Sequence, residues 1–548
     1  MYPSTISPPY GFRPAGGRIC KYGAFSGAAG GKNPGKRKNM KQYQMFELTL
    51  EGPVLDRNWA QIDLEAVFSQ GSREIAVRGF YAGEGKYRIR FLPESTGVWN
   101  WRVRGLLTAE GSEECVEGGS CSLVRAAGTH FEKADGSLFR PFGTTVYALI
   151  HQEPELIART MDTLRESPFS KVRLCVFPKH YRYNANEPQW YPFEKKADGT
   201  WDVNRPCFAF WDHLDARLEE LDWAGIQADL ILFHCYDRWG FASLSREENL
   251  IYLDYLIRRL AAHPNVWWSL ANEYDLCLEH KSITDWEEIE AFMAARDPFR
   301  HLLSCHNCFQ PWDFSRPAVT HISVQTKRLA HSAAWLKQYG KPLVVDECCY
   351  EGNIAEFWGS ITGEEMTARF WRVFVSGGYA THGETFCDGG DVLWWSKGGV
   401  LKGSSPSRIA FLKRIAEEIP GPVEPVRLGF SAHLLATDEE LDRMIREAPP
   451  EARCFIQAAR RMPYEDRRVF AEMEMEWACR CGEEVFLYYL DNRPCAGTVL
   501  RLPDTHTYRI EVIDTWNMTR ETVADSASGE TEVALPGRPW MAVFAKRI

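Results

Sequence analysis

Short apolar runs alternate with stretches of helical spacing between about residues 128 and 420. Alternation of this kind is typical of repeated βα units in a parallel sheet. Eight runs have the length of a strand, and they span residues 142–149, 171–177, 228–234, 266–272, 301–307, 321–325, 342–347 and 378–386. Helical patterns fit between nearly all of these runs; residues 208–225 end in a glycine, and residues 246–263 stop before a proline. Eight strands and eight helices in about 290 residues predict a (β/α)8 TIM barrel, an α/β fold.

A doubly wound open sheet is the alternative fold for such an alternation of strands and helices. That fold usually carries a glycine-rich phosphate turn after its first strand. Neither a G-x-G-x-x-G pattern nor a Walker pattern occurs in the chain, so the barrel is the preferred prediction.

The segments on either side of the predicted barrel have the period-two pattern of β-strands. From about residue 45 to 124, short alternating runs recur at roughly ten-residue spacing, which predicts an N-terminal β-sandwich. Alternating runs return after residue 420 and predict a C-terminal all-β domain. The predicted domains are therefore 42–126, 127–420 and 421–548. Residues 1–41 are rich in Gly, Pro, Lys and Arg, and we expect them to form a disordered or loosely attached extension.

Charge and hydropathy exclude several classes of function. The chain of 548 residues has a net charge of −10, which argues against nucleic acid or an anionic membrane as a partner. No run of about 18 apolar residues predicts a transmembrane helix. The N-terminal segment has no apolar core of a signal peptide, so a cytoplasmic location is expected.

Cysteine and aromatic usage add two weaker indications. Most of the 16 cysteines, such as Cys175 and Cys235, lie in apolar runs, where reduced and buried thiols are expected. The C-x-x-C spacing at Cys305–Cys308 lacks two further ligands for a zinc site, so no metal is predicted. Aromatic residues make up 13% of the chain, with 20 Trp, which is compatible with binding of sugar rings.

Two carboxylates stand where predicted strands end. Glu273 follows the fourth run directly, and Glu347 ends the seventh. Barrel enzymes carry their chemistry at the carboxyl ends of strands, and strands four and seven face each other across the barrel. Paired carboxylates flanking one bond are the equipment of glycoside hydrolysis. The apolar residues that precede Glu273, among them Trp267 and Trp268, favour a raised pKa for this carboxyl group.

Other interpretations of these carboxylates stay open. Each glutamate could form a structural salt bridge at a strand end. Asp346 could replace Glu347, although strict alternation along the strand would point Asp346 to the opposite face. Glu384, a third carboxylate, could also displace Glu347 from this role.

The same strand ends carry side chains suited to hydrogen bonding with sugar hydroxyls or to stacking on a sugar ring. These candidate substrate-binding residues are Arg173, His180, His234, Asp237, Trp239, Asn272, His306, Gln325, His382, Glu384 and Trp395.

The motifs around these residues resemble known families. "LANE" and "VVDE" resemble clan-A retaining glycoside hydrolases, in which the Asn-Glu pair carries the acid/base and the strand-seven Glu is the nucleophile. More closely, "VRLCVFPKHY", "NVWWSLANEYD", "DECCYEGNI" and "GGYATHGETF" resemble bacterial proteins with an apiosidase-like (DUF4038-like) barrel between a DUF5060-like β-sandwich and a DUF5605-like β-domain. The resemblance implies Glu273 as acid/base, Glu347 as nucleophile and Asn272 as a ligand of the sugar. Clan-A enzymes often have Tyr where this chain has Gln325.

We therefore expect a glycoside hydrolase that acts on a short oligosaccharide or a small plant-derived glycoside, by retention and without a metal or organic cofactor. The resemblance indicates a pentose or unusual sugar. Three alternatives remain: an inverting glycosidase, a non-catalytic carbohydrate-binding protein on a barrel scaffold, and an enzyme of phosphorylated metabolites with an anion site at Ser396–Gly399. The second predicts loss of one of the two carboxylates, and both are present. Carbohydrate is the expected partner, and a homo-oligomer is left open.

Overall fold

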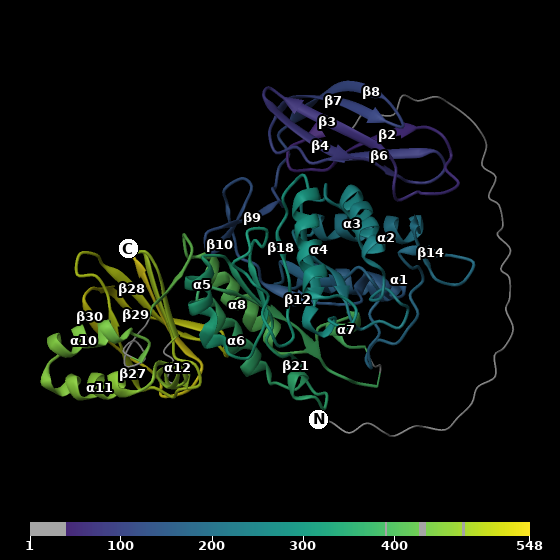
Figure 1. Ribbon diagram of the computed structural model, residues 1–548. Coiled ribbons are helices and arrows are strands. Elements are labelled where there is room, and N and C mark those ends of the chain that lie inside the picture. Colours follow the sequence, from purple (N-terminus) through teal and green to yellow (C-terminus); the bar gives the residue numbers. More distant parts are fainter. Residues whose placement is uncertain (1–39, 390–391, 427–433, 474–476) are drawn as a thin grey trace, which may run out of the picture. The chain divides into compact units, whose positions relative to one another are not determined.

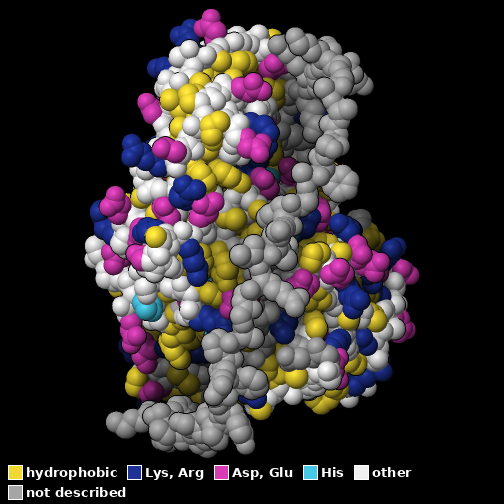
Figure 2. Space-filling model, turned by 90° about the vertical axis from the view of Figure 1, so that its right-hand side faces the viewer, with side chains coloured by type: hydrophobic (Ala, Val, Ile, Leu, Met, Phe, Trp, Pro, Cys, Tyr) yellow, Lys and Arg dark blue, Asp and Glu magenta, His cyan; other side chains and the backbone are white. Residues whose placement is uncertain are grey.

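The computed structural model describes residues 40–389, 392–426, 434–473 and 477–548 (Figure 1). The predicted extension, residues 1–41, lies outside the described residues except for Met40 and Lys41, which form β1. No helix of the described residues combines the length and the apolar content that crossing a membrane requires. Acidic and basic side chains are interspersed over the face seen in Figure 2.

The centre of the fold is an eight-stranded parallel sheet with the strand order β18-β17-β16-β13-β12-β22-β20-β19. Each strand lies within one of the eight predicted runs, except that Gln227 extends β16 one residue before its run. Their bounds are β12 Gly143–Thr145, β13 Lys171–Cys175, β16 Gln227–His234, β17 Val266–Asn272, β18 Leu303–Ser304, β19 Ile322–Gln325, β20 Leu343–Glu347 and β22 Tyr379–His382.

The sheet curves into a nearly closed barrel whose two ends are β18 and β19. Single contacts bridge this seam: the Thr320 N–H donates to Leu303 O at 2.9 Å, and the Ser304 hydroxyl donates to His321 O at 2.7 Å. The barrel prediction is therefore confirmed, and the doubly wound alternative is wrong.

Helices follow the strands and cover the outside of the barrel (Figure 1). The predicted helices 208–225 and 246–263 correspond to α2 and α3. A capping box at Ser245 and Glu248 fixes the start of α3, because each side chain accepts the other residue's backbone N–H. The barrel helices are α1 Pro154–Glu166, α2 Phe208–Trp223, α3 Arg246–Leu260, α4 Ile283–Arg296, α5 Ser332–Tyr339, α6 Gly363–Val375, α7 Trp394–Lys397 and α8 Ser405–Glu417, with short turns η1 Leu149–His151, η2 Tyr274–Leu276, η3 Leu329–His331 and η4 Phe357–Gly359.

A bulge in β20 corrects one expectation from strict alternation. Val324 pairs with Val345 and Gln325 pairs with Glu347, so Asp346 is an extra residue in the strand. The Asp346 carboxylate accepts a hydrogen bond at 2.7 Å from Lys171, which lies across the barrel on β13. Both Asp346 and Glu347 therefore face the inside of the barrel, at different depths, and Asp346 does not point to the opposite face.

The segment before the barrel is β-rich. It contains two sheets, with the strand orders β1-β8-β7-β3-β4 and β2-β6-β5. Phe68 of the first sheet stacks on Phe91 of the second, with ring centroids 4.0 Å apart. Arg90 connects this segment to the barrel through an ion pair with Asp215 of α2 at 2.7 Å. The strands are β2 Phe46–Glu51, β3 Leu64–Gln70, β4 Arg73–Arg78, β5 Phe80–Tyr81, β6 Lys86–Phe91, β7 Gly97–Gly105 and β8 Ala109–Val116.

Small sheets accompany the barrel. In the first of them, Phe131 packs against Trp267 and Tyr379, with ring centroids 5.0 and 5.5 Å away, and so covers the amino-terminal end of the barrel. The strands are β9 Val124–Ala127, β10 His130–Lys133, β11 Leu138–Phe139, β14 Phe193–Lys195, β15 Trp201–Pro206, β21 Glu351–Gly352 and β23 Glu384–Thr385.

The segment after the barrel differs from the predicted all-β domain, because three helices lie inside it. They are α10 Asp438–Glu447, α11 Pro450–Arg461 and α12 Tyr464–Met473. Arg372 of α6 ties this segment to the barrel through an ion pair with Asp491 at 2.8 Å. The strands are β24 Glu424–Val426, β25 Trp477–Cys481, β26 Val485–Tyr489, β27 Gly497–Arg501, β28 Tyr508–Asp514, β29 Thr519–Ala527, β30 Glu530–Ala534 and β31 Met541–Arg547.

Candidate active site

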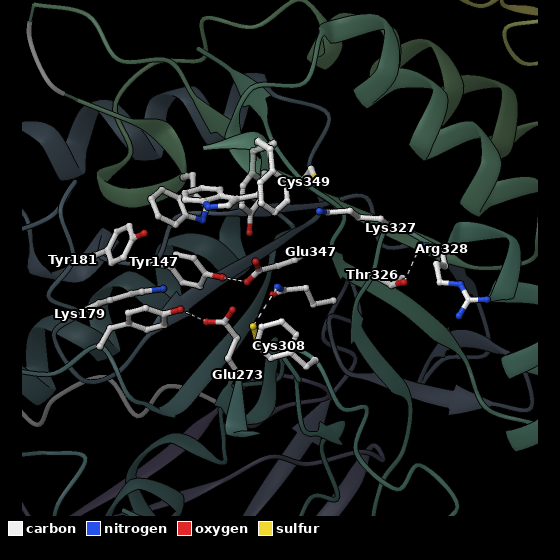
Figure 3. A pocket seen from close by; sticks show the side chains of 17 residues that line it. Tyr147, Lys179, Tyr181, Glu273, Cys308, Thr326, Lys327, Arg328, Glu347 and Cys349 are labelled. Carbon is white, nitrogen blue, oxygen red and sulfur yellow. Dashed lines mark hydrogen bonds between the residues drawn. The ribbon is translucent and has the colours of Figure 1, made fainter. Parts of the chain in front are cut away.

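A pocket of about 520 Å³ opens at the carboxyl ends of the barrel strands (Figure 3). Four of the residues predicted from the sequence line it: Glu273, Gln325, Glu347 and Trp395. A volume of this size lies within the range of small-molecule sites. Residues from several strand ends thus meet at one place, as the barrel topology requires.

Glu273 is held at the end of β17 by a backbone conformation that is rare for residues other than glycine. Its φ of 55° lies in the left-handed region, which costs of order 1 kcal/mol and persists only where neighbours enforce it. The carboxylate accepts hydrogen bonds from the Tyr236 hydroxyl and from Asn272 Nδ2, the latter at 3.0 Å. Burial, and then the negative charge of Glu347, raise the pKa of Glu273.

Glu347 is placed differently, because a cation lies next to it. Nη1 of Arg173, a fully buried side chain, lies 3.5 Å from Glu347 Oε1. The Tyr147 hydroxyl donates to the same carboxylate and also lies 2.9 Å from Asn272 Oδ1. Burial and the charge of Glu347 raise the pKa of Tyr147 well above its usual value, so Tyr147 stays a hydrogen-bond donor.

Gln325 connects the two carboxylates. With its amide nitrogen turned toward them, it donates to Glu347 Oε2 at 3.0 Å and to Glu273 Oε1 at 3.2 Å. These two carboxylate oxygens are therefore at most about 6 Å apart, a separation that two groups acting on one bond would need.

Lys179 and a group of aromatic side chains complete the pocket. The Lys179 ammonium lies 3.5 Å from the centroid of the Tyr147 ring and 4.2 Å from that of Tyr236, in cation–π contact with both. Trp358 and Trp395, with centroids 5.2 Å apart, form an apolar wall. The sequence-based prediction missed four lining residues that the geometry brings to the carboxylates: Tyr147, Tyr236, Tyr350 and Trp358.

Three predicted residues lie directly beneath the pocket. Arg173, Asn272 and His306 are buried and contact the two carboxylates without lining the cavity. His306 Nδ1 accepts the backbone N–H of Glu273 at 3.4 Å. Burial and then the charge of Arg173 lower the pKa of His306 well below its usual value, so it is a neutral acceptor.

The remaining predicted residues are not among those that line this pocket. Asp237 accepts three backbone N–H groups of its own loop, and Trp239 donates its indole N–H to Glu187 at 2.8 Å. His180 packs edge-on against the Trp239 ring. His234 is buried in the barrel wall and donates to Phe177 O at 3.2 Å.

His382 and Glu384 are buried together behind the pocket, with His382 Nε2 at 3.6 Å from Glu384 Oε1. Glu384 does not line the cavity that Glu347 lines. Its carboxylate instead accepts the backbone N–H groups of Lys402 and Gly403.

Three family models match successive parts of the chain. The model described as an apiosidase-like catalytic domain covers residues 125–402, which include all eight barrel strands. Two domains of unknown function, DUF5060 and DUF5605, match residues 39–105 and 473–546. Among proteins with curated functions, none matches this chain.

Solved structures from Bacteroides vulgatus share the fold. A candidate glycoside hydrolase is 30% identical, with a TM-score of 0.80, and the match covers 93% of this chain and 100% of that one. A glycoside hydrolase of family 5 is 12% identical, with a TM-score of 0.54 and coverage of 77% and 93%. The second likeness concerns the fold alone.

Proposed function

Because this chain belongs to the family of proteins with an apiosidase-like catalytic domain, we propose that it hydrolyses an O-glycosidic bond with retention of anomeric configuration. The observation that carries the proposal is the convergence of Glu273 and Glu347 in one pocket, with the Gln325 amide within hydrogen-bonding distance of both. A pair of carboxylates on either side of a scissile bond is what this reaction needs.

The separation of the carboxylates favours retention over inversion. Retaining enzymes hold their two carboxyl groups about 5–5.5 Å apart, whereas inverting enzymes need about 6.5–9.5 Å to admit a water molecule. Glu347 Oε2 and Glu273 Oε1, the two oxygens next to the Gln325 amide, are at most about 6 Å apart, nearer to the retaining value than to the middle of the inverting range.

The surroundings of the two carboxylates support different roles. Glu347, next to the fixed charge of Arg173, is the nucleophile that attacks the anomeric carbon as a carboxylate. Glu273, whose pKa is raised, protonates the leaving oxygen as that bond breaks. In the second step Glu273 takes a proton from water, the water oxygen bonds to the anomeric carbon, and Glu347 leaves as a carboxylate.

The pocket favours a small glycoside or a short oligosaccharide as substrate. Its aromatic wall at Trp358 and Trp395 offers flat apolar surface for the C–H face of a sugar ring. Lys179 lines the cavity and offers a hydrogen-bond donor for hydroxyls. A protein that only binds carbohydrate would not need two carboxylates joined by one amide, so we place that alternative second.

The test is a screen of α- and β-aryl glycosides of pentoses and hexoses with the full chain and two variants. We expect Glu347→Gln and Glu273→Gln each to lower kcat by at least about 10³-fold on any substrate cleaved. Glu290→Gln is the matched control, since Glu290 is a buried carboxylate on α4 that bonds Trp312 and Arg316 outside the pocket. Near-normal turnover by Glu347→Gln would contradict the proposed nucleophile, and inversion of the product seen by NMR would contradict retention.

A further inference from the structure

Three buried ionisable side chains gather behind the wall of the pocket. Glu351 of β21, His382 at the end of β22 and Glu384 of β23 offer ligand atoms that all lie within 4.8 Å of one another. All three are at most 3% exposed. Within the described parts of the chain, this is the one group of three or more His, Cys, Asp and Glu side chains that could hold a metal ion.

The two carboxylates of this cluster have backbone partners but no cationic side chain. Glu351 accepts the N–H groups of Ser404 and Ser405 at 2.7 and 3.0 Å, and Glu384 accepts those of Lys402 and Gly403 at 2.7 and 3.0 Å. In the residues that the structure describes, neither forms an ion pair with Lys or Arg. Two neighbouring buried charges of one sign are costly, and a bound cation would offset that cost.

His382 supplies an independent indication of a ligand. Its Nε2 atom is fully buried, faces Glu384 and has no hydrogen-bond partner among the described residues. Its Nδ1 atom lies 3.2 Å from the Thr144 hydroxyl. A metal-binding histidine carries its proton on the other ring nitrogen and donates it to a neighbour, and Thr144 Oγ1 is in place to accept it. The Nε2 lone pair would then point toward the carboxylates.

Gly403 lies so close to this cluster that a side chain would not fit there. A Cβ atom at this position would lie 2.4 Å from Glu351 Oε2 and 2.6 Å from Glu384 Oε1. The backbone of Gly403 is not among the positive-φ glycines, so space rather than conformation requires a glycine here. The missing side chain lets the two carboxylates converge.

We propose that Glu351, His382 and Glu384 bind one divalent transition-metal ion, Zn²⁺ or Mn²⁺. One imidazole with two carboxylates suits these ions, whereas Ca²⁺ and Mg²⁺ prefer oxygen ligands alone. The ion would join the segment that follows Glu347 to the end of β22, because β21 pairs with β23 through Glu351 and Glu384. Its role is therefore structural, and it takes no part in the hydrolysis proposed above.

The experiment measures metal content and thermal stability of the full chain, produced without a histidine tag. We expect about one equivalent of Zn²⁺ or Mn²⁺ by elemental analysis, a Tm about 3 °C or more lower after chelation, and recovery on adding Zn²⁺ or Mn²⁺ but not Mg²⁺. His382→Gln should lose the ion. The matched control is His151→Gln, because His151 is buried with both ring nitrogens unpartnered in the described structure but lies outside the cluster.

Two results would overturn the proposal. One is a wild-type chain with no bound metal and no response of Tm to Zn²⁺ or Mn²⁺. The other is a His382→Gln variant that still binds one equivalent of the metal ion. If His382→Gln does not fold, the wild-type metal content and Tm decide alone. Neither readout depends on glycosidase activity.

Discussion

Tyr236 offers a way to test whether Glu273 is the acid of the reaction. Its hydroxyl donates to Glu273 Oε2, an oxygen that also accepts from Asn272 Nδ2 at 3.0 Å. A hydrogen bond to a carboxylate favours the ionised form and so lowers its pKa. Tyr236→Phe removes this donor and makes the site less polar, and both changes raise the pKa of Glu273 further.

The size of the effect follows from the number of donors. A hydrogen bond to a charged group contributes about 1.5–3 kcal/mol, which corresponds to about 1–2 pH units. Because Asn272 keeps its bond, we expect the lower end, so the alkaline limb of kcat/KM should move up by about one pH unit.

The assay is the pH profile of kcat/KM for the best aryl glycoside, with Tyr181→Phe as control. Tyr181 also lines the pocket, but in the described structure its hydroxyl makes no hydrogen bond to either carboxylate. An alkaline limb that stays in place or moves to lower pH in Tyr236→Phe would refute the assignment of Glu273 as acid. An equal shift in Tyr181→Phe would show that loss of any pocket hydroxyl has this effect.

Three further changes test the interior of the barrel and the pocket. Lys171→Met removes the cation closest to the buried carboxylates of Asp229 and Asp346, and we expect a loss of about 3–5 kcal/mol in urea unfolding. Lys86→Met, at an exposed position, should cost little. Burial would raise the pKa of Asp297, but the charge and hydrogen bonds of His301 lower it to about 2. The ionised Asp297 therefore contributes about 2 kcal/mol to stability above pH ~4, and this contribution is lost as the pH falls toward 2. In Asp297→Asn we expect a smaller decline of stability over this pH range. Lys179→Met should lower kcat/KM about tenfold or more without changing Tm by more than a few degrees, since it removes a donor and a charge from the pocket.

The strands of the barrel could be predicted because each is buried on both faces. β13, β16 and β17 are buried along their whole length, so they appear in the sequence as short runs rich in apolar residues. The buried charges Lys171, Arg173 and Asp229 interrupt two of these runs. Their carboxyl ends then locate polar residues such as Glu273 and Glu347 without knowledge of the fold's details.

What could not be predicted depends on geometry beyond the strand pattern. The bulge at Asp346 is set by pairing between β19 and β20, which periodicity along one strand does not encode. Tyr236 reaches the pocket from the loop that follows β16, so no fixed spacing along the sequence marks it. The missed helix α10 had a local signal, since Thr437 and Glu440 form a capping box.

The charged layer beneath the pocket explains how two glutamates so close together can differ. Lys171 ion-pairs with Asp229 and Asp346 at 2.6 and 2.7 Å, and this buried layer holds Arg173 with its guanidinium between Asp346 and Glu347. A buried arginine cannot lose its proton, so its charge stays next to Glu347 at any working pH. Glu273 receives its direct hydrogen bonds from neutral groups, and the negative charge of Glu347 raises its pKa. A carboxyl group with a raised pKa suits the acid, and a carboxylate beside a fixed cation suits the nucleophile.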